Sequence, residues 1–231
     1  MQISVITLFP EIFTSVFSES IIKRAIQKQI ISVDYIQLRQ FASDAYGSVD
    51  DHPYGGGHGM VLRVDVVDKA IQYAKSKINA QSHTIILDAS GTPYTQKKAE
   101  SLTTQEHLIL ICGHYEGFDE RIFSLVDERI SIGDYILTGG EIPAMVLIDS
   151  VTRLLSGTLK KSVATEDESF SKDALLLEYP QYTRPENFGT SSVPSILLSG
   201  NHKQIQEWRD KESIQRTKKL RPDLIEKTDL P

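Results

Sequence analysis

The chain has 231 residues, 40% of them hydrophobic, and a formal net charge of −6 at pH 7. This length and composition suit a buried core with a smaller satellite domain, and they exclude a largely disordered chain. The single cysteine, Cys112, excludes a disulfide framework and a cysteine-based metal site. The apolar run at 1–10 lacks a basic start and stops at Pro10, too short for a signal peptide or a membrane span. We therefore expect a cytoplasmic protein without a membrane segment.

Short apolar runs alternate with amphipathic segments along the first two thirds of the chain. This alternation is typical of a parallel α/β sheet whose strands are joined by helices. The first helix is expected at 10–29, with Ile12, Val16, Ile22 and Ile26 on one side. In chain order, the expected elements are strands at 3–8, 31–38, 84–88 and 107–111, helices at 10–29, 65–77, 96–102 and about 141–155, and a polar, glycine-rich loop at 39–60.

The last third of the chain differs in pattern. Residues 157–168 are polar, show no helical or strand period and contain an acidic run at 166–168, so we interpret them as an interdomain linker. Beyond the linker, Ser199 or Asn201 is suited to cap a helix. Residues 200–221 hold seven Lys and Arg against three Asp and Glu, which predicts a local basic surface on a small helical domain.

Two glycine-bearing turns, at 112–117 and 132–140, each follow a β-rich apolar run. Glycine lets backbone approach a ligand closely, and ligands of open α/β sheets bind at the C-terminal ends of strands. A helix entered through Pro143 follows the second turn. The residues alone therefore predict a nucleotide-binding α/β domain with a basic helical appendage.

Five segments, in the same order along the chain, carry a resemblance to a known family. They are 8–13, 51–60, 113–121, 131–149, and 182–185 together with 198–202. The chain resembles, from end to end, the bacterial tRNA (guanine-N1)-methyltransferases of the TrmD family, members of the knotted SPOUT class. The resemblance implies a SPOUT-type parallel sheet with a deep trefoil knot, whereas the pattern alone favours an unknotted sheet because knots are rare.

The resemblance also implies a reaction, the transfer of a methyl group from S-adenosylmethionine to N1 of guanosine 37 of tRNA, just 3′ of the anticodon. It implies a catalytic, cofactor-binding domain at 1–158, a linker at 159–171 and a helical tRNA-binding domain at 172–231. Another SPOUT RNA methyltransferase, acting at a different RNA site, is the alternative, but it should lack the loop at 54–60. A metabolic nucleotide-dependent enzyme or a non-catalytic RNA-binding protein would share only the glycine turns.

In the family, the two turns belong to the knot and bind the cofactor mostly through backbone groups. Leu87 should flank the adenine, and Glu116 should face the positive end of the cofactor. A competing interpretation makes Glu116 the cap of a helix at 119–125. The cofactor-binding residues that the resemblance implies are Leu87, Gly113, Glu116, Ile132, Gly133, Asp134, Tyr135, Ile136, Leu137, Gly139, Gly140 and Pro143.

Methylation of guanine N1 requires removal of the N1 proton and stabilisation of negative charge on O6, hence a base and a cationic donor. The resemblance places the family's arginine at Arg153; the competing interpretation is an arginine that only compensates the helix dipole. The family's base is an acid directly before Ser-Phe. Alignment to the family without a gap after Arg153 places this base at Glu168, which is slightly preferred. Matching the local sequence at 164–167 to the family requires a one-residue insertion and places the base at Asp167. The family also suggests Mg²⁺ as a further cofactor.

The loop at 54–59 resembles the family's target-base loop, whose glycines would let a flipped guanine come close. It lacks the Lys and Ser/Thr of a P-loop, the competing interpretation. Basic side chains of the second domain are expected to bind tRNA phosphates. The resemblance implies a homodimer with an active site shared between chains, for which the run at 144–148 offers apolar surface. No protein metal ligands are expected. The substrate-binding residues so implied are Tyr54, Gly55, Gly56, Gly57, Gly59, Lys203 and Arg209.

Overall fold

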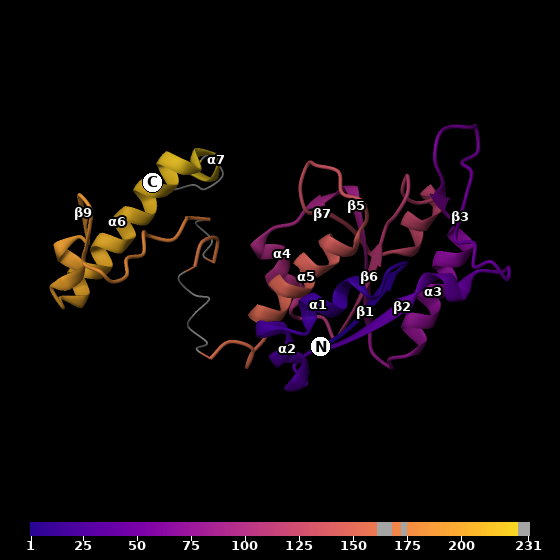
Figure 1. The fold of residues 1–231 in the computed structure, drawn as a ribbon, viewed down its shortest axis with the longest axis horizontal. Coiled ribbons are helices and arrows are strands. Elements are labelled where there is room, and N and C mark those ends of the chain that lie inside the picture. The colour runs from indigo at the N-terminus through magenta and orange to yellow at the C-terminus, as the bar shows by residue number, and fades with distance from the viewer. Residues whose placement is uncertain (161–167, 172–174, 226–231) are drawn as a thin grey trace. The chain divides into compact units, whose positions relative to one another are not determined.

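The computed structural model describes residues 1–160, 168–171 and 175–225. The chain divides into two compact units, Met1–Lys160 and Lys161–Pro231 (Figure 1). The first unit contains a parallel sheet and the helices that cover it, and the second contains a long helix and a short hairpin. Asp167, one of the two expected bases, lies outside the described residues.

A five-stranded parallel sheet with the order β2-β1-β6-β5-β7 forms the centre of the first unit. The central strand β6 is buried along its whole length, as expected for a parallel sheet with helices on both faces. The sheet confirms the expected α/β class. The strands are β1 (Gln2–Thr7), β2 (Ser32–Gln37), β5 (Ser82–Pro93), β6 (His107–Cys112) and β7 (Glu128–Ser131).

Helices cover both faces of this sheet (Figure 1). The side chains of α1, α2, α4 and α5 share one core cluster with Leu108 and Leu110 of β6, whereas α3 shares the other with Ile109 and Ile111. The alternation along β6 therefore sends successive side chains to opposite layers. The helices of this unit are α1 (Ile12–Phe17), α2 (Ser20–Gln27), α3 (Val64–Ser76), α4 (Gln96–Leu102) and α5 (Glu141–Leu154).

The single helix expected at 10–29 is wrong, because two helices, α1 and α2, occupy this segment. Ser20 has a φ of 55°, a left-handed conformation that a continuous helix does not contain. The break also changes the buried face. Phe13 and Phe17 are buried, whereas Ile12 and Val16 are 46% and 49% exposed.

Strand β5 is longer than the strand expected at 84–88, because it continues past an irregularity. Its register with β7 shifts so that Leu87 and Thr92 both pair with Ile130. A Cβ at Gly91 would come within 2.5 Å of the carbonyl carbon of Ile130. Glycine at 91 is therefore required for β5 to pack against β7 at this bulge.

The apolar run at 144–148 is mostly internal, which corrects its expected role as dimer surface. Ala144, Leu147 and Ile148 are at most 1% exposed and pack in the core of their own unit. Within the run, Val146 is 40% exposed, and Ile142, just before the run, is 51% exposed. They lie four positions apart, so they share one face of the helix.

An antiparallel hairpin of β3 (Asp50–Asp51) and β4 (Val61–Leu62) leaves the sheet, and the loop between its strands projects beyond it (Figure 1). This geometry agrees with the polar, glycine-rich loop expected at 39–60. Within the described ranges, no helix has the length and apolar character needed to cross a membrane.

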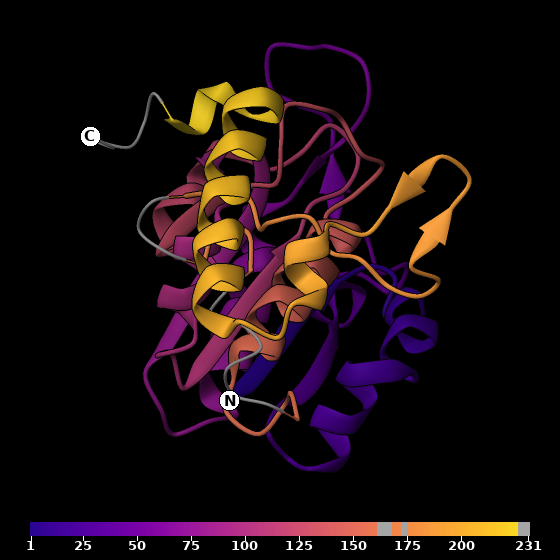
Figure 2. The ribbon, with the colours of Figure 1, turned by 90° about the vertical axis from the view of Figure 1, so that its left-hand side faces the viewer.

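The second unit is built around α6 (His202–Leu220), followed by the short α7 (Pro222–Ile225). The side chain of Asn201 accepts a hydrogen bond from the backbone N–H of Gln204 and caps α6, as one of the two expected caps. A small hairpin of β8 (Asn187–Phe188) and β9 (Ser191–Ser192) stands to one side of α6 (Figure 2).

Candidate active site

The two glycine turns meet beyond the C-terminal ends of β6 and β7. The backbone N–H of Gly140 donates a hydrogen bond to the carbonyl oxygen of Gly113 at 2.8 Å. A Cβ at Gly140 would lie 2.6 Å from both the Cα of Cys112 and the amide nitrogen of Gly113. Backbone therefore packs directly on backbone here, which glycine alone permits.

A cavity of about 410 Å³ lies between these turns and the bulge of β5. This volume falls within the range of roughly 300–1,000 Å³ that is usual for small-molecule sites. Leu87 borders the cavity from β5, and Pro143 borders it from the first turn of α5. Eleven of the twelve expected cofactor-binding residues line it: Leu87, Gly113, Glu116, Ile132, Gly133, Tyr135, Ile136, Leu137, Gly139, Gly140 and Pro143.

The residues that line the cavity also differ in part from the expected cofactor-binding residues. Asp134 is exposed and does not line it. Asp88 and Ala89 line it but were not expected, because the predicted strand ended at residue 88 and the bulge that turns these residues inward depends on β7. The remaining lining residues all lie within two positions of an expected residue; they are His114, Tyr115, Gly117, Phe118, Ile130, Ser131 and Thr138.

Glu116 lies between the cavity and the loop at 54–59. It lines the cavity, and its backbone N–H donates a hydrogen bond to the carbonyl oxygen of Met60 at 3.0 Å. A Cβ at Gly59 would come within 2.4 Å of the Glu116 Cγ. The competing role of Glu116 as a helix cap is wrong, because Asp119 caps the 3₁₀ helix Glu120–Leu125 by accepting from the N–H of Arg121.

The loop at 54–59 is open. Tyr54 is fully exposed, and Gly55, Gly56 and Gly57 have φ values of 88°, 81° and 138°. A Cβ at Gly55 or Gly56 would meet no atom within 4 Å. These glycines therefore serve the left-handed backbone of the loop, and Tyr54 is available to an incoming ligand.

Arg153 lies in the last turn of α5, half-buried, and does not line the cavity. At a rise of 1.5 Å per residue, it is about 15 Å along the helix from Pro143. Glu168 belongs to the second unit, where its backbone carbonyl accepts hydrogen bonds from the N–H and Oγ of Ser171 at 3.2 and 2.6 Å.

The two expected phosphate-binding residues of α6 differ in their surroundings. Lys203 is exposed in the first turn of the helix. The guanidinium of Arg209 is half-buried, with its central carbon 4.6 Å from the centre of the Tyr179 ring. The Arg209 Nε is buried without a hydrogen-bond partner among the described residues. Arg209 and Glu168 both line a smaller cavity of about 190 Å³.

The described residues contain no group of three or more His, Cys, Asp and Glu side chains that could hold a metal ion.

Comparison with known proteins identifies one family over nearly the whole chain. Residues 1–227 match the family described as tRNA (Guanine-1)-methyltransferase TrmD. The tRNA (guanine-N(1)-)-methyltransferase of Geobacillus kaustophilus is 52% identical over 227 residues, which cover 98% of this chain and 92% of the relative. The corresponding protein of Syntrophomonas wolfei is 49% identical over 225 residues, which cover 97% of this chain and 90% of the relative. The chain therefore belongs to the TrmD family of tRNA (guanine-N1)-methyltransferases.

Proposed function

We propose that the protein transfers a methyl group from S-adenosylmethionine to N1 of guanosine 37 in tRNA, directly 3′ of the anticodon. One observation carries the proposal. The two turns that match the family's cofactor-binding segments, far apart in sequence, meet through the Gly140–Gly113 hydrogen bond around one cavity. The names of the related proteins supply the acceptor, since they are tRNA (guanine-N(1)-)-methyltransferases.

The residues that line the cavity fit S-adenosylmethionine. Backbone of the two turns offers hydrogen-bond donors and acceptors, and Leu87 provides apolar surface for an adenine ring. A Cβ at Gly139 or Gly140 would enter space already held by neighbouring atoms, so the turns are shaped around glycine. When bound, the cofactor supplies an activated methyl group on a positively charged sulfonium. We assign Glu116 to the positive end because its carboxylate borders the same space.

The acceptor requires two side-chain functions. The base, Glu168 or Asp167, takes the proton from guanine N1, so that the nitrogen lone pair becomes available. Arg153 donates hydrogen bonds to guanine O6, where negative charge accumulates as the proton leaves. The loop at 54–59, with the exposed Tyr54, receives the flipped guanine, and its attachment to Glu116 through Met60 holds it beside the cavity.

The position of Arg153 supports a homodimer with a shared active site. It lies about 15 Å along α5 from Pro143, so we assign it to the site of a second copy. Ile12 and Val16 on α1 and Ile142 and Val146 on α5 supply exposed apolar surface for the interface, at 40–51% exposure each.

Co-expression of two defective chains tests the shared site. A Gly140→Ala chain cannot bind the cofactor, and an Arg153→Ala chain lacks the side chain that donates hydrogen bonds to guanine O6. Each homodimer should therefore be inactive. In a mixed dimer, one cavity is intact and receives Arg153 from the other chain. We expect methyl transfer to return in the mixture. Activity no higher than in either single variant would contradict the shared site.

The knot and the domain roles complete the proposal. The turn at 132–140 lies against backbone of the turn at 112–117, which supports a chain threaded at this point into a deep trefoil knot. We assign residues 1–158 to cofactor binding and catalysis and residues 172–231 to tRNA binding. Lys203 and Arg209 of α6 contact tRNA phosphates. The described residues offer no cluster that would hold Mg²⁺. If Mg²⁺ takes part, as the resemblance suggests, chelation with EDTA would lower the rate.

Methyl transfer to defined transcripts tests the reaction. Labelled S-adenosylmethionine is incubated with tRNA transcripts that carry G or A at position 37. We expect incorporation only into the G37 transcript, and a fall in kcat of about 10²–10⁴ when Glu168→Gln or Asp167→Asn removes the base. Glu166→Gln, in the same acidic run, is the matched control and should keep full activity. Equal labelling of both transcripts would contradict the substrate, and full activity in both acid variants would contradict the base.

A further inference from the structure

The segment that follows β1 matches the family at 8–13 but has no role in the reaction described so far. Thr7, the last residue of β1, is fully buried. Its Oγ1 accepts a hydrogen bond from the N–H of Phe9 at 2.9 Å and donates one to the Oε1 of Glu141 at 2.7 Å. The end of β1 is thereby tied to the first residue of α5, 134 positions away in the sequence.

Glu141 is a buried carboxylate directly after the second glycine turn. It is 4% exposed, and a Cβ at Gly139 would lie 2.4 Å from its Oε2. Burial of a carboxylate is unfavourable unless hydrogen bonds and favourable dipoles compensate for it. Thr7 supplies one such hydrogen bond, and the N-terminus of the 14-residue α5 supplies the dipole.

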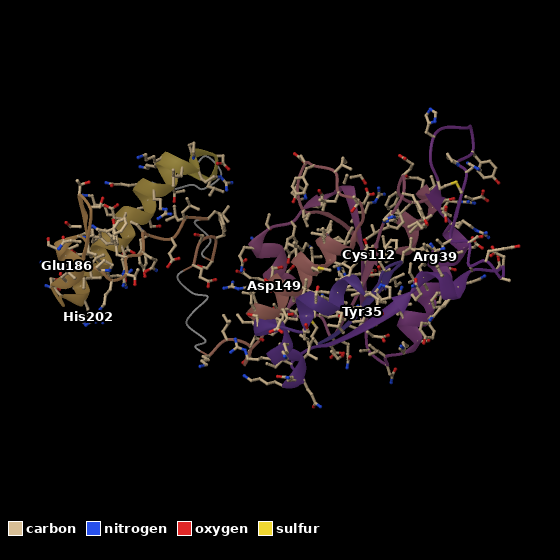
Figure 3. The ribbon with its side chains drawn as sticks, viewed as in Figure 1. Tyr35, Arg39, Cys112, Asp149, Glu186 and His202 are labelled. Carbon is tan, nitrogen blue, oxygen red and sulfur yellow. The ribbon has the colours of Figure 1, made fainter. Side chains whose placement is uncertain are left out.

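Glu141 also lies near the residue that begins the other turn, Cys112. Burial, with a contribution from Glu141, raises the pKa of the Cys112 thiol well above its usual value. Cys112 ends β6 in the interior of the first unit (Figure 3) and directly precedes Gly113. The Cβ at Gly139 that would meet the Glu141 carboxylate would also lie 3.2 Å from the carbonyl oxygen of Gly113, so Glu141 lies close to both cofactor turns.

Phe9 supports the first turn in the same way that Thr7 supports the second. Its ring packs edge-on against the ring of His114, with the centroids 5.1 Å apart. The His114 Nδ1 would lie 2.8 Å from a Cβ at Gly139, so this ring fills the space beside the second turn. One short segment, Thr7 to Phe9, thus contacts the supports of both turns.

We propose that Thr7, Phe9 and Glu141 are positioning residues of the cofactor cavity, which hold the two glycine turns against each other before S-adenosylmethionine binds. This inference rests on the proposed function of the cavity. None of the three residues lines the cavity, so each acts through the turns. A site held in its binding geometry loses less conformational freedom on binding, and loss of the support should therefore weaken affinity.

Loss of these supports should affect S-adenosylmethionine and not tRNA. Loosened turns bind the cofactor less well in the ground state and in the transition state alike, which raises KM with little change in kcat. The KM for tRNA should stay unchanged, because the loop at 54–59 is attached to the cavity through Met60 and Glu116 and not through Thr7. A general loss of stability would not separate these constants in this way.

Calorimetry with S-adenosylmethionine on the full-length protein, together with initial-rate kinetics, tests the inference. Thr7→Val keeps the shape of the side chain and removes the hydroxyl. Thr84→Val is the matched control, because Thr84 is a fully buried strand threonine whose Oγ1 has no hydrogen-bond partner in the described part of the chain. We expect Thr7→Val and Glu141→Ala each to weaken the affinity for S-adenosylmethionine by about tenfold. This is the size expected for loss of a hydrogen bond to a carboxylate. Thr84→Val should bind as the wild type does.

Two further variants sharpen the result. Glu141→Gln keeps an oxygen that accepts from Thr7 and should recover most of the affinity that Glu141→Ala loses. The double variant Thr7→Val, Glu141→Ala should bind S-adenosylmethionine as tightly as the single variant with the lower affinity. Both changes break the same Thr7–Glu141 hydrogen bond, so their effects should not add. Wild-type affinity in Thr7→Val, or an equal loss in Thr84→Val, would overturn the positioning role alone. A wild-type protein that does not bind S-adenosylmethionine would overturn the proposed function itself.

Discussion

Glycine serves different purposes in the cavity wall and in the loop at 54–59. In the cavity wall, a Cβ at Gly113, Gly139 or Gly140 would lie 2.4–2.7 Å from a neighbouring atom, so these positions are glycine because space is lacking. In the loop, Gly55 and Gly56 have positive φ values and open space around them, so they are glycine because of backbone conformation. The cavity wall is therefore closely packed, whereas the tip of the loop is open to solvent.

The largest expected effect comes from Gly140→Ala. The new methyl group would meet backbone atoms of Cys112 and Gly113, which cannot rotate away as a side chain would. The turns must then separate, and overpacking of this kind destabilises by about 1–3 kcal/mol. We expect loss of measurable S-adenosylmethionine binding by calorimetry, with a folded protein by circular dichroism. Unchanged affinity would show that close packing at Gly140 does not shape the cavity.

Gly59→Ala should have an intermediate effect, because Gly59 combines both constraints. Its φ is 79°, and its Cβ would approach the Cγ of Glu116 to 2.4 Å. The Glu116 side chain can rotate to relieve this contact, but its carboxylate is then displaced from its place at the cavity. We expect KM to rise for both S-adenosylmethionine and tRNA in steady-state assays. A rise in only one of the two constants would argue against coupling between loop and cavity through Glu116.

Gly56→Ala should affect the acceptor alone. Its Cβ would meet nothing within 4 Å, but the left-handed backbone disfavours alanine by roughly 1 kcal/mol. We therefore expect a severalfold rise in the KM for tRNA and wild-type affinity for S-adenosylmethionine. A D-alanine at 56, introduced by chemical ligation, is compatible with positive φ and should restore the KM. Failure of that rescue would mean that the methyl group itself obstructs the guanine.

The smallest effect concerns the opposite end of the sheet. His107 is fully buried between the hydroxyls of Ser4 and Ser82, at 3.0 and 2.8 Å, and burial lowers its pKa. In the unfolded chain the pKa of this histidine is about 6.5, so at acidic pH the unfolded chain binds more protons than the native protein. Stability from this residue is therefore present above that value and lost as pH falls below it. Melting temperatures between pH 8 and pH 5 should fall less steeply for His107→Gln than for the wild type; parallel curves would contradict this assignment.

The sequence predicts the parts of this structure that depend on local pattern. Buried runs such as 107–111 identify the strands, and the glycines of the two turns identify the cavity wall. It does not predict features that depend on distant partners. The break at Ser20 accompanies burial of Phe13 and Phe17 in the core of the first unit. The position of Asp88 at the cavity follows from a bulge against Ile130. The Thr7–Glu141 hydrogen bond joins residues that no local pattern relates.

Nucleoside analysis of the RNA product shows directly whether the protein methylates N1 of guanosine 37. An unmodified tRNA transcript with G37 is incubated with the protein and S-adenosylmethionine, digested to nucleosides and examined by mass spectrometry against authentic standards. We expect 1-methylguanosine from the wild type and none from Gly140→Ala. A ribose-methylated nucleoside, a methyl group on another base, or 1-methylguanosine that persists in Gly140→Ala would contradict this expectation.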